Sequence, residues 1–424
     1  MLKRIEAQIK ALGCGVWELR EESTRAWEFY FIRHALDQNR VSELNTIFVT
    51  LYRPMEDGML GSASGEIFPT ASEAEIQKAL SDIYFQASLV KNPSYRLNDK
   101  PLVSPALQEV DSAAIAKDFI STMSQLRETE TEDVNSYEIF IREITRHYRN
   151  SNGVDYTVRY PSSMIEVVVN ARKGDHEIEL YRSFQSGSCD VEKLRCDTEK
   201  ALQYGKDRLV TEPTPMLNQF DVLFSTGDAR SIYRYFAAKT MVDLIFQKVS
   251  DWTPGKPVAE SVQGDRITLQ AVSTLKNSSA SYPFDEEGAV IRDRTLIRDG
   301  VVEALWGHRR FSQYLGLEDC SMVKNFVVKG GAHSEAELRQ GDYLEVVEFS
   351  DFQVDPISGD IAGEIRLGYL HQNGQVRVVS GGSVSGQMAA AIPTMEFSSE
   401  TEQYDTAVIP RVTKLKNLKI TGLK

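Results

Sequence analysis

The sequence has few of the residues that build metal and disulfide frameworks. Its 424 residues include four cysteines and six histidines. Four scattered cysteines are too few for a disulfide framework in a chain of this length, so we expect a reduced, cytoplasmic protein. The two closest histidines, His308 and His333, are 25 residues apart, which excludes every metal motif that places two histidines on one helical turn.

Features of several other functional classes are also missing. No stretch approaches the roughly 18 apolar residues of a membrane span, and residues 1–13 alternate polar with apolar side chains, unlike a signal peptide. The chain has no G-x-x-x-x-G-K-S/T phosphate loop and no G-x-G-x-x-G segment after a strand. The glycine-rich run 381–386 has its serines in the wrong places for a nucleophile elbow and favours a tight turn. We therefore expect no membrane association, and no self-contained catalytic site is visible.

Positive charge is in deficit, since 48 Lys and Arg face 61 Asp and Glu and the net charge at pH 7 is −13. A duplex-binding protein gains most of its affinity by neutralising phosphates with Lys and Arg, so direct nucleic-acid binding is disfavoured. The 42% hydrophobic and 26% charged residues are ordinary for a globular chain. At about 100–200 residues per domain, the length predicts two or three domains.

Hydrophobic periodicity predicts an α+β fold for the N-terminal half. Apolar residues recur at helical spacing in the first twelve residues, and capping-type residues open two later helices. Runs of aromatic and β-branched residues favour strands, whereas the Gly- and Ser-rich run 58–65 is expected to interrupt them. Helices are expected at 2–12, 70–90 and 111–127, and strands at 16–19, 27–31, 47–51, 137–148, 154–160 and 165–171.

Two prolines in the segment 211–215 favour a domain boundary, because proline cannot continue a helix or a central strand. We expect an N-terminal sheet-and-helix domain at 1–210 and a C-terminal β-rich domain at 211–424. The C-terminal domain is predicted to begin with a strand at 220–224 and one long helix at 228–249, followed by many strands. Asp299-Gly300 and Asn373-Gly374 are typical of hairpin turns.

A string of motifs in the second half resembles the TldD/PmbA family. Pro283-Phe284-Asp285-Glu286-Glu287-Gly288 is similar to the family's PFD-x-EG segment, and a hairpin segment at 295–302 and a leucine-glycine turn at 314–316 follow it. Three further segments resemble those of the family and follow in the same order. They are Asn325–Val328 with Gly331, Asp355–Asp360, and Gln372–Val376. The last of these contains the Asn373-Gly374 pair. The N-terminal half also fits the family layout.

The resemblance implies a proteolytic system built from two related subunit types. The TldD type carries H-E-x-x-x-H on the helix after the first strand of the C-terminal domain, with a downstream Cys as third zinc ligand, and the PmbA (TldE) type lacks them. Residues 228–246 of this chain contain no His, Glu or Cys, and residues 395–401 contain no Cys. The resemblance therefore implies a PmbA-type chain with no cofactor of its own, and zinc in a TldD-type partner.

Elementary zinc chemistry agrees with this implication. A catalytic zinc needs about three protein ligands and must lower the pKa of its bound water to about 7. Tyr233 and Arg234, which stand where the motif would fall, cannot do this, and the arginine would repel the cation. Ligands drawn from scattered carboxylates remain an alternative. Whether the chain is an enzyme stays open, although this metallopeptidase-family member is expected to lack the zinc site.

The leading hypothesis is a subunit that contributes architecture and binding of unfolded peptide, while the zinc-bearing homologue cuts. Strand-rich surfaces hold extended peptides by edge addition. Arg230 and Arg234, four residues apart with Tyr233 between them, are candidates to face a peptide carboxylate or an acidic partner surface. The alternative is that they form the solvated face of an amphipathic helix.

A second hypothesis is a homodimeric, non-catalytic binding or regulatory module, which corresponds to the family's description as modulators of DNA gyrase. Pro283, Phe284, Asp285 and Gly288, with the Asn373-Gly374 pair, are the family-motif residues singled out. Asp285 and Glu286 either line a cleft or cap a turn. Pro-Phe-Asp-x-x-Gly is good turn chemistry, so the turn is favoured.

Overall fold

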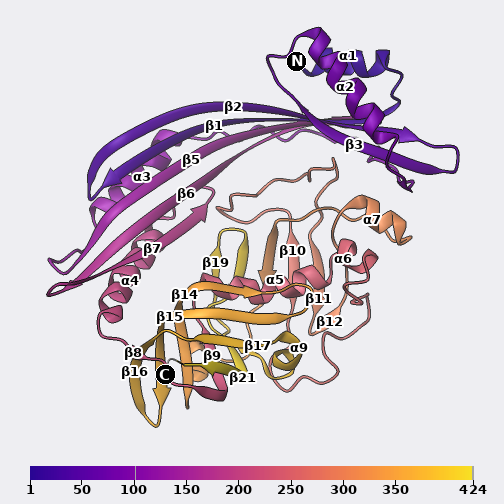
Figure 1. The fold of residues 1–424 in the computed structure, drawn as a ribbon. Helices are drawn as coiled ribbons and strands as arrows, with labels where there is room; N and C mark the ends of the chain where they lie inside the picture. The colour runs from indigo at the N-terminus through magenta and orange to yellow at the C-terminus, as the bar shows by residue number, and fades with distance from the viewer. Residues whose placement is uncertain (101, 423–424) are drawn as a thin grey trace.

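The computed structural model describes residues 1–100 and 102–422 (Figure 1). The chain builds an antiparallel seven-stranded sheet from its first half and two sheets, of six and eight strands, from its second half. The seven-stranded sheet arches over the second half of the chain (Figure 1). No helix within the described ranges is both long and apolar enough to cross a membrane. The mixed α+β class is confirmed.

The seven-stranded sheet has unusually long central strands. Its spatial order is β4-β3-β2-β1-β5-β6-β7. The strands are β1 Val16–Ile32, β2 Ala35–Pro54, β3 Met59–Ile67, β4 Asn92–Pro93, β5 Glu132–Asn150, β6 Asp155–Lys173 and β7 His176–Ser186. The short strands expected at 16–19 and 27–31 are the two ends of β1. The polar residues between them stay in the strand because residues 20–26 pair with β2 on one side and β5 on the other.

The expected interruption at 58–65 was wrong, because this run forms most of β3. Its glycines are needed for packing and do not break the strand. A side chain at Gly61 would overlap the main chain at Ala87, and one at Gly65 would lie 2.7 Å from a carbon of Ile83. Helix α2 can therefore lie directly on this strand.

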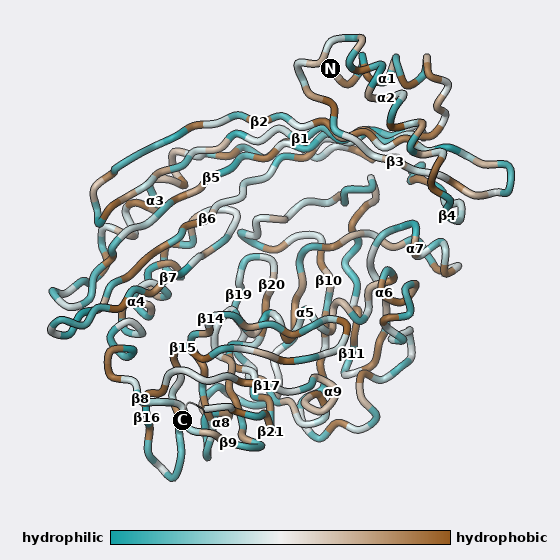
Figure 2. Tube along the Cα trace, in the orientation of Figure 1, coloured by the Kyte–Doolittle hydropathy of each residue, from teal (hydrophilic) through white to brown (hydrophobic). Residues whose placement is uncertain are grey.

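The four helices of this half cover the two ends of the sheet (Figure 1). They are α1 Leu2–Ala11, α2 Glu73–Ala87, α3 Ser112–Ser124 and α4 Val191–Arg208. The predicted helix starts are confirmed, since Ser72 forms a capping box with Glu75 and the Asp111 side chain accepts from Ala114 N. Hydrophobic and hydrophilic residues alternate along strands such as β6 (Figure 2), which places one face in the core.

The second half of the chain is rich in strands. Its eight-stranded sheet closes on itself, because β14 pairs with both β9 and β15. The strands of the two sheets are β8 Glu212–Pro213, β9 Leu217–Phe224, β10 Leu269–Val272, β11 Arg294–Arg298, β12 Val301–Val302, β13 Asn325–Val328, β14 Tyr343–Val354, β15 Asp360–Gln372, β16 Gln375–Ser380, β17 Ser383–Gln387, β18 Glu396–Phe397, β19 Thr401–Tyr404, β20 Ala407–Pro410 and β21 Thr413–Thr421. The sheets change between α4 and β8; a domain boundary at 210/211 stays a prediction.

The helices of this half are short. They are the 3-10 turn η1 Gly227–Ala229, α5 Arg230–Lys239, α6 Val242–Phe246, α7 Arg309–Tyr314, α8 Glu335–Leu338, α9 Met388–Ala391 and the 3-10 turn η2 Ile392–Thr394. Both predicted hairpin turns are confirmed, with positive φ at Asp299 (46°) and Gly300 (79°) and at Asn373 (53°) and Gly374 (73°).

The single long helix expected at 228–249 is instead divided into η1, α5 and α6. The break falls at Thr240 and Met241, where Met241 is extended and forms a parallel bridge with Trp306. The Val242 amide also donates to the Trp306 carbonyl at 2.9 Å. The chain therefore leaves the helix because a distant segment uses its backbone groups, which local periodicity could not indicate.

The motif turn 283–288 joins the second half of the chain to the long sheet. Tyr156 of β6 donates its hydroxyl to the Asp285 carbonyl oxygen at 2.5 Å. Asn98 donates to the Gly288 carbonyl oxygen, and Gly288, at φ 73°, lies so close to Tyr148 that any side chain there would overlap the ring. The Asp285 carboxylate accepts from the amides of Glu287, Ala289 and Met322. Asp285 therefore caps the turn, as the turn chemistry predicts.

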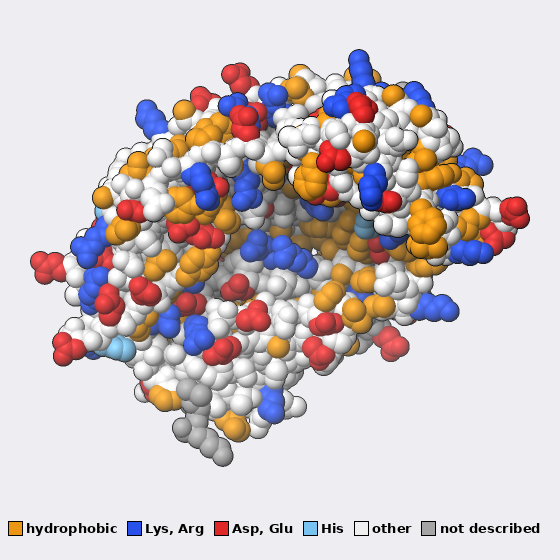
Figure 3. Space-filling view, turned by 45° about the horizontal axis from the view of Figure 1, so that its top comes forward, with side chains coloured by type: hydrophobic (Ala, Val, Ile, Leu, Met, Phe, Trp, Pro, Cys, Tyr) orange, Lys and Arg blue, Asp and Glu red, His pale blue; other side chains and the backbone are white. Residues whose placement is uncertain are grey.

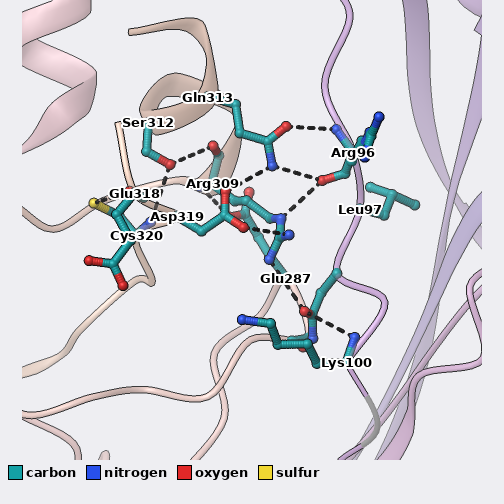
Figure 4. A network of polar contacts seen from close by, with 12 residues as sticks. Arg96, Leu97, Lys100, Glu287, Arg309, Ser312, Gln313, Glu318, Asp319 and Cys320 are labelled. Carbon is teal, nitrogen blue, oxygen red and sulfur yellow. Dashed lines mark hydrogen bonds and ion pairs between the residues drawn. The ribbon is translucent and has the colours of Figure 1, made fainter. Parts of the chain in front are cut away.

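Helix α7 adds a second connection across the same contact (Figure 4). The Arg309 guanidinium donates from Nε to the Arg96 carbonyl oxygen at 2.9 Å and forms an ion pair with Asp319 at 2.6 Å. Gln313 exchanges two hydrogen bonds with the main chain of Arg96. Arg309 is only 8% exposed, so this network is a buried polar tie between residues that lie far apart in the sequence.

The turn also gathers buried carboxyl groups. Burial raises the pKa of Asp285 to about 6, against the backbone donors that lower it. Burial and the neighbouring Asp285 charge raise the pKa of Glu287 to about 7. Burial likewise raises the pKa of Glu18, which accepts from Tyr52 and Tyr148. Glu286 differs, because Arg146, Lys324 and Arg20 outweigh its burial and lower its pKa.

The close approach at Gly288 predicts a large cost for a methyl group. We expect Gly288→Ala to lower the free energy of unfolding by about 3 kcal/mol, because it combines the left-handed backbone conformation with overpacking against Tyr148. Gly174→Ala is the matched control, since Gly174 also has positive φ but open space around it, and should cost about 1 kcal/mol. Urea denaturation of both variants measures the difference, and equal losses would contradict the close packing.

The raised pKa values predict the pH dependence of stability. Because folded Asp285 and Glu287 bind protons more tightly than they do in the unfolded chain, their stabilising contribution is lost as pH rises from about 4.5 through 7. Glu287→Gln should remove up to about 1.4 kcal/mol per pH unit of this loss. The Glu287→Gln variant does not titrate at this position, so it should be more stable than the wild type at pH 8 and equally stable at pH 4.5. Denaturant midpoints at the two pH values measure the difference.

Glu286→Gln is the neighbouring control for this titration. Because the folded pKa of Glu286 is lowered, its stabilising contribution is present above its unfolded pKa and is lost at lower pH. Glu286→Gln should therefore destabilise the protein at pH 7, the opposite sign to Glu287→Gln. The same sign for both variants at neutral pH would show that the buried turn does not perturb the two groups as described.

Candidate functional site

Helix α5 carries the three residues singled out as binding candidates, and the structure separates them. Tyr233 is only 3% exposed, and its hydroxyl lies 2.7 Å from Thr413 Oγ1. Arg234 is exposed, whereas Arg230 is partly buried. Tyr233 is therefore a core residue of the C-terminal half, on the inward face of the amphipathic helix; its contact with a peptide or partner stays a prediction, which this burial disfavours.

The side chains of α5 do not fit a zinc ion. Burial raises the pKa of Tyr233 far above its ordinary value, and its hydroxyl is already hydrogen-bonded. Tyr235 and Phe236 pack against Trp252. In the ranges 1–100 and 102–422, no three His, Cys, Asp or Glu side chains are grouped so that they could hold a metal ion. No hydrolytic step through a metal is derived for this chain.

The start of α5 opens instead onto a cavity of about 330 Å³. Arg230 lines this cavity, together with the preceding residues 225–228. Its other walls come from strand β7, helix α4, Val347 and Phe349 of β14, and Tyr404 with Asp405. The cavity therefore lies between the long sheet with its helix α4 and the second half of the chain. Figure 3 shows one face of the molecule hollowed beneath the arched sheet, with basic and acidic side chains around the hollow.

Most charged groups that line the cavity already have partners. Lys193 and Lys200 pair with Asp197 at 2.9 and 3.7 Å, and Arg182 pairs with Glu348 at 3.5 Å. Among the remaining lining carboxylates, the Asp190 side chain caps α4 by accepting from Lys193 N. Asp405 accepts from the backbone amide and hydroxyl of Ser279. These pairs fix the walls of the cavity.

Arg230 is different, because it forms no ion pair with any carboxylate in the described part of the chain. Its Nε donates to the Gly227 carbonyl oxygen at 2.8 Å. Burial and the nearby charge of Arg234 lower the pKa of Arg230, and Asp228 and Asp405 only partly oppose this. Burial raises the pKa of Asp228, which accepts from Thr226 Oγ1. A partly buried guanidinium without a counterion favours an anionic ligand.

The family-motif residues lie outside this cavity. Pro283, Phe284, Asp285 and Gly288 form the turn against the long sheet, and Asn373 and Gly374 form the β15–β16 hairpin. Their roles are structural in this arrangement. Sequence reasoning missed β7 and α4 as cavity walls, since neither carries a motif.

Comparison with known proteins gives matches over the C-terminal half and over the whole fold. The family model described as the PmbA/TldA metallopeptidase C-terminal domain matches residues 218–422. A metalloprotease PmbA homolog from Haemophilus influenzae is 23% identical over 290 residues, covering 65% of this chain and 62% of that protein. The chain spans less than two thirds of the length of the curated relatives it matches.

Two crystal structures share the complete fold. TldE from Thermococcus kodakarensis aligns with a TM-score of 0.78 at 16% identity, covering 99% of this chain and 100% of that one. A candidate modulator of DNA gyrase from Bacteroides thetaiotaomicron aligns with a TM-score of 0.81 at 17% identity, covering 100% of this chain and 99% of that one. The family-model match over residues 218–422 and the PmbA homolog support membership of the TldD/PmbA family, and the two crystal structures show that the fold is shared over the whole chain.

Proposed function

We propose that this chain is the PmbA (TldE)-type subunit of a TldD/PmbA metallopeptidase system. It contributes architecture and peptide binding, and a zinc-bearing TldD-type homologue supplies the metal. The observation that carries the proposal is helix α5. At the place where the zinc-bearing type has its ligands, this chain has buried aromatic side chains, with the Tyr233 hydroxyl engaged by Thr413.

The chemistry of peptide hydrolysis supports this division of labour. A zinc-activated water needs about three protein ligands and a lowered pKa, and α5 offers a phenol of strongly raised pKa and an exposed cation at Arg234. The cavity at the start of α5 offers binding groups in their place, above all the unpaired Arg230. The side chains that line this cavity can bind and orient an extended peptide.

The setting of the proposed complex is the cytoplasm. All four cysteines are free thiols in the structure, and two of them, Cys14 and Cys320, are buried. Burial raises the pKa of Cys320 to about 11, so that thiol is not a nucleophile at neutral pH. The partner is proposed to be a zinc-bearing homologue, and a homodimer of this chain alone is the competing assembly.

Mixing the two subunit types tests the proposal. We expect no cleavage of an unfolded peptide substrate by this chain alone, and cleavage when a TldD-type homologue from the same genome is added in equimolar amount. Co-elution of the two chains in size-exclusion chromatography should accompany the activity. A stable homodimer that neither binds the homologue nor increases its activity would favour the regulatory, gyrase-modulator alternative.

Metal removal gives a second test. Elemental analysis of this chain alone should find well under one zinc per chain, because α5 lacks a fitting donor set. EDTA should abolish cleavage by the mixture while leaving the melting temperature of this chain unchanged, since its folding uses no metal. Stoichiometric zinc in the isolated chain, or a melting temperature that falls on chelation, would overturn the assignment as the metal-free subunit.

A further inference from the structure

Strand β7 presents an unpaired edge. It is the last strand of the seven-stranded sheet, and β6 is its one partner strand among the residues that the structure describes. In the described part of the chain, residues 182–186 make no other backbone-to-backbone hydrogen bond. An unpaired edge of this kind offers a row of N–H and C=O groups to any extended segment that reaches it.

The free edge of β7 faces the cavity. Six consecutive residues, Tyr181 to Ser186, line it. Successive side chains of a strand point to opposite faces of the sheet, so a cavity on one face would meet only every second residue. Lining by six consecutive residues therefore points to the edge of the strand, where the backbone of each residue is reached. Helix α4 and the segment 225–230 form the opposite walls.

The cavity also holds one positive charge that the protein leaves free. Lys193, Lys200 and Arg182 are each paired with a carboxylate within 4.0 Å, whereas among residues 1–100 and 102–422 Arg230 has the Gly227 carbonyl oxygen as its one hydrogen-bond partner. A guanidinium binds a carboxylate through two parallel N–H donors. A ligand carboxylate would supply the direct ion pair that Asp228 and Asp405, which act on Arg230 only through space, do not form with it.

Size and lining limit the ligand further. The cavity volume of about 330 Å³ is at the small end for ligand pockets, so it admits the end of a chain and not a folded segment. The aromatic side chains of Phe119, Phe349 and Tyr404 contribute to its walls. An apolar or aromatic terminal side chain fits this lining better than a charged one.

We propose that this cavity is a subsite for the C-terminal end of an extended peptide, whose backbone pairs with the free edge of β7 and whose terminal carboxylate pairs with Arg230. The proposal rests on the proposed peptide-handling function and specifies which part of the peptide this chain holds. It gives β7 an interaction role and Arg230 a specificity role, distinct from the buried motif turn.

A matched pair of probe peptides tests the carboxylate contact without altering the protein. The probe is an N-terminally fluorescein-labelled Ala-Ala-Ala-Ala-Phe with a free C-terminal carboxylate, and its control is the same peptide with a C-terminal amide. Fluorescence anisotropy with this chain alone should give about tenfold to hundredfold tighter binding for the free acid, as expected for a charged hydrogen-bonded pair. Equal affinities would overturn the carboxylate contact.

Two arginine variants assign the contact to one residue. Arg230→Gln should remove the preference for the free acid, whereas Arg234→Gln, on the same helix but exposed, should keep it. Loss of the preference in both variants would indicate a general charge effect and overturn the assignment.

Competition with succinate shows whether the cavity recognises a peptide or any small carboxylate. Succinate at the same concentration as the peptide should not displace it. If it does, the cavity is a site for small carboxylates and the peptide proposal is overturned.

Hydrogen exchange tests the backbone contact. Binding of the free-acid peptide should slow exchange of amides within residues 182–186 at least several-fold, while amides of β3, near the opposite edge of the sheet, should be unchanged. Unchanged exchange in β7 would overturn edge pairing. These binding measurements need neither zinc nor a partner. If they fail while the two-subunit mixture still cleaves peptide, the subsite proposal is overturned and the proposed function is retained.

Discussion

The contact between the turn 283–288 and the long sheet is the constraint on which the rest of the arrangement depends. Tyr148 and Tyr156 project from β5 and β6 onto this turn, and Gly288 is the residue that lets the ring of Tyr148 approach the main chain. The buried network around Arg309 holds the neighbouring segment 96–98 in the same place. Because these groups are buried and mutually satisfied, the sheet and the second half of the chain are held in one relative position.

That fixed position creates the cavity at the start of α5. Its walls come from β7 and α4 on one side and from residues around Arg230 on the other, so neither half of the chain contains it alone. The same packing places Tyr233 in the core and leaves Arg230 at the cavity wall, although the two residues are three positions apart. The role we propose for this chain is therefore recognition of an extended ligand with an anionic end, and hydrolysis is proposed to belong to another polypeptide.

Sequence reasoning was most accurate where local chemistry decides the structure. The capping box at Ser72, the cap at Asp111 and the hairpin turns at Asp299 and Asn373 depend on a few adjacent residues, and each was predicted. It failed at the glycines of 58–65 and at the break near Met241, because both depend on a distant partner. Helix α2 requires Gly61 to be small, and the main chain of Trp306 accepts from the Val242 amide and donates to the Thr240 carbonyl oxygen.

The sequence by itself determined the resemblance to the TldD/PmbA family, the α+β class and the lack of histidine and cysteine donors along 228–246, because these depend on residue identity and order. Only the tertiary structure decided which of the candidate residues faces the cavity where we propose that a ligand binds. Periodicity indicates that a helix has two faces, but not what each face meets, and a strand edge becomes a binding surface only when nothing pairs with it. Arg230 and the free edge of β7 meet because residues some 45 positions apart in the chain pack around one cavity.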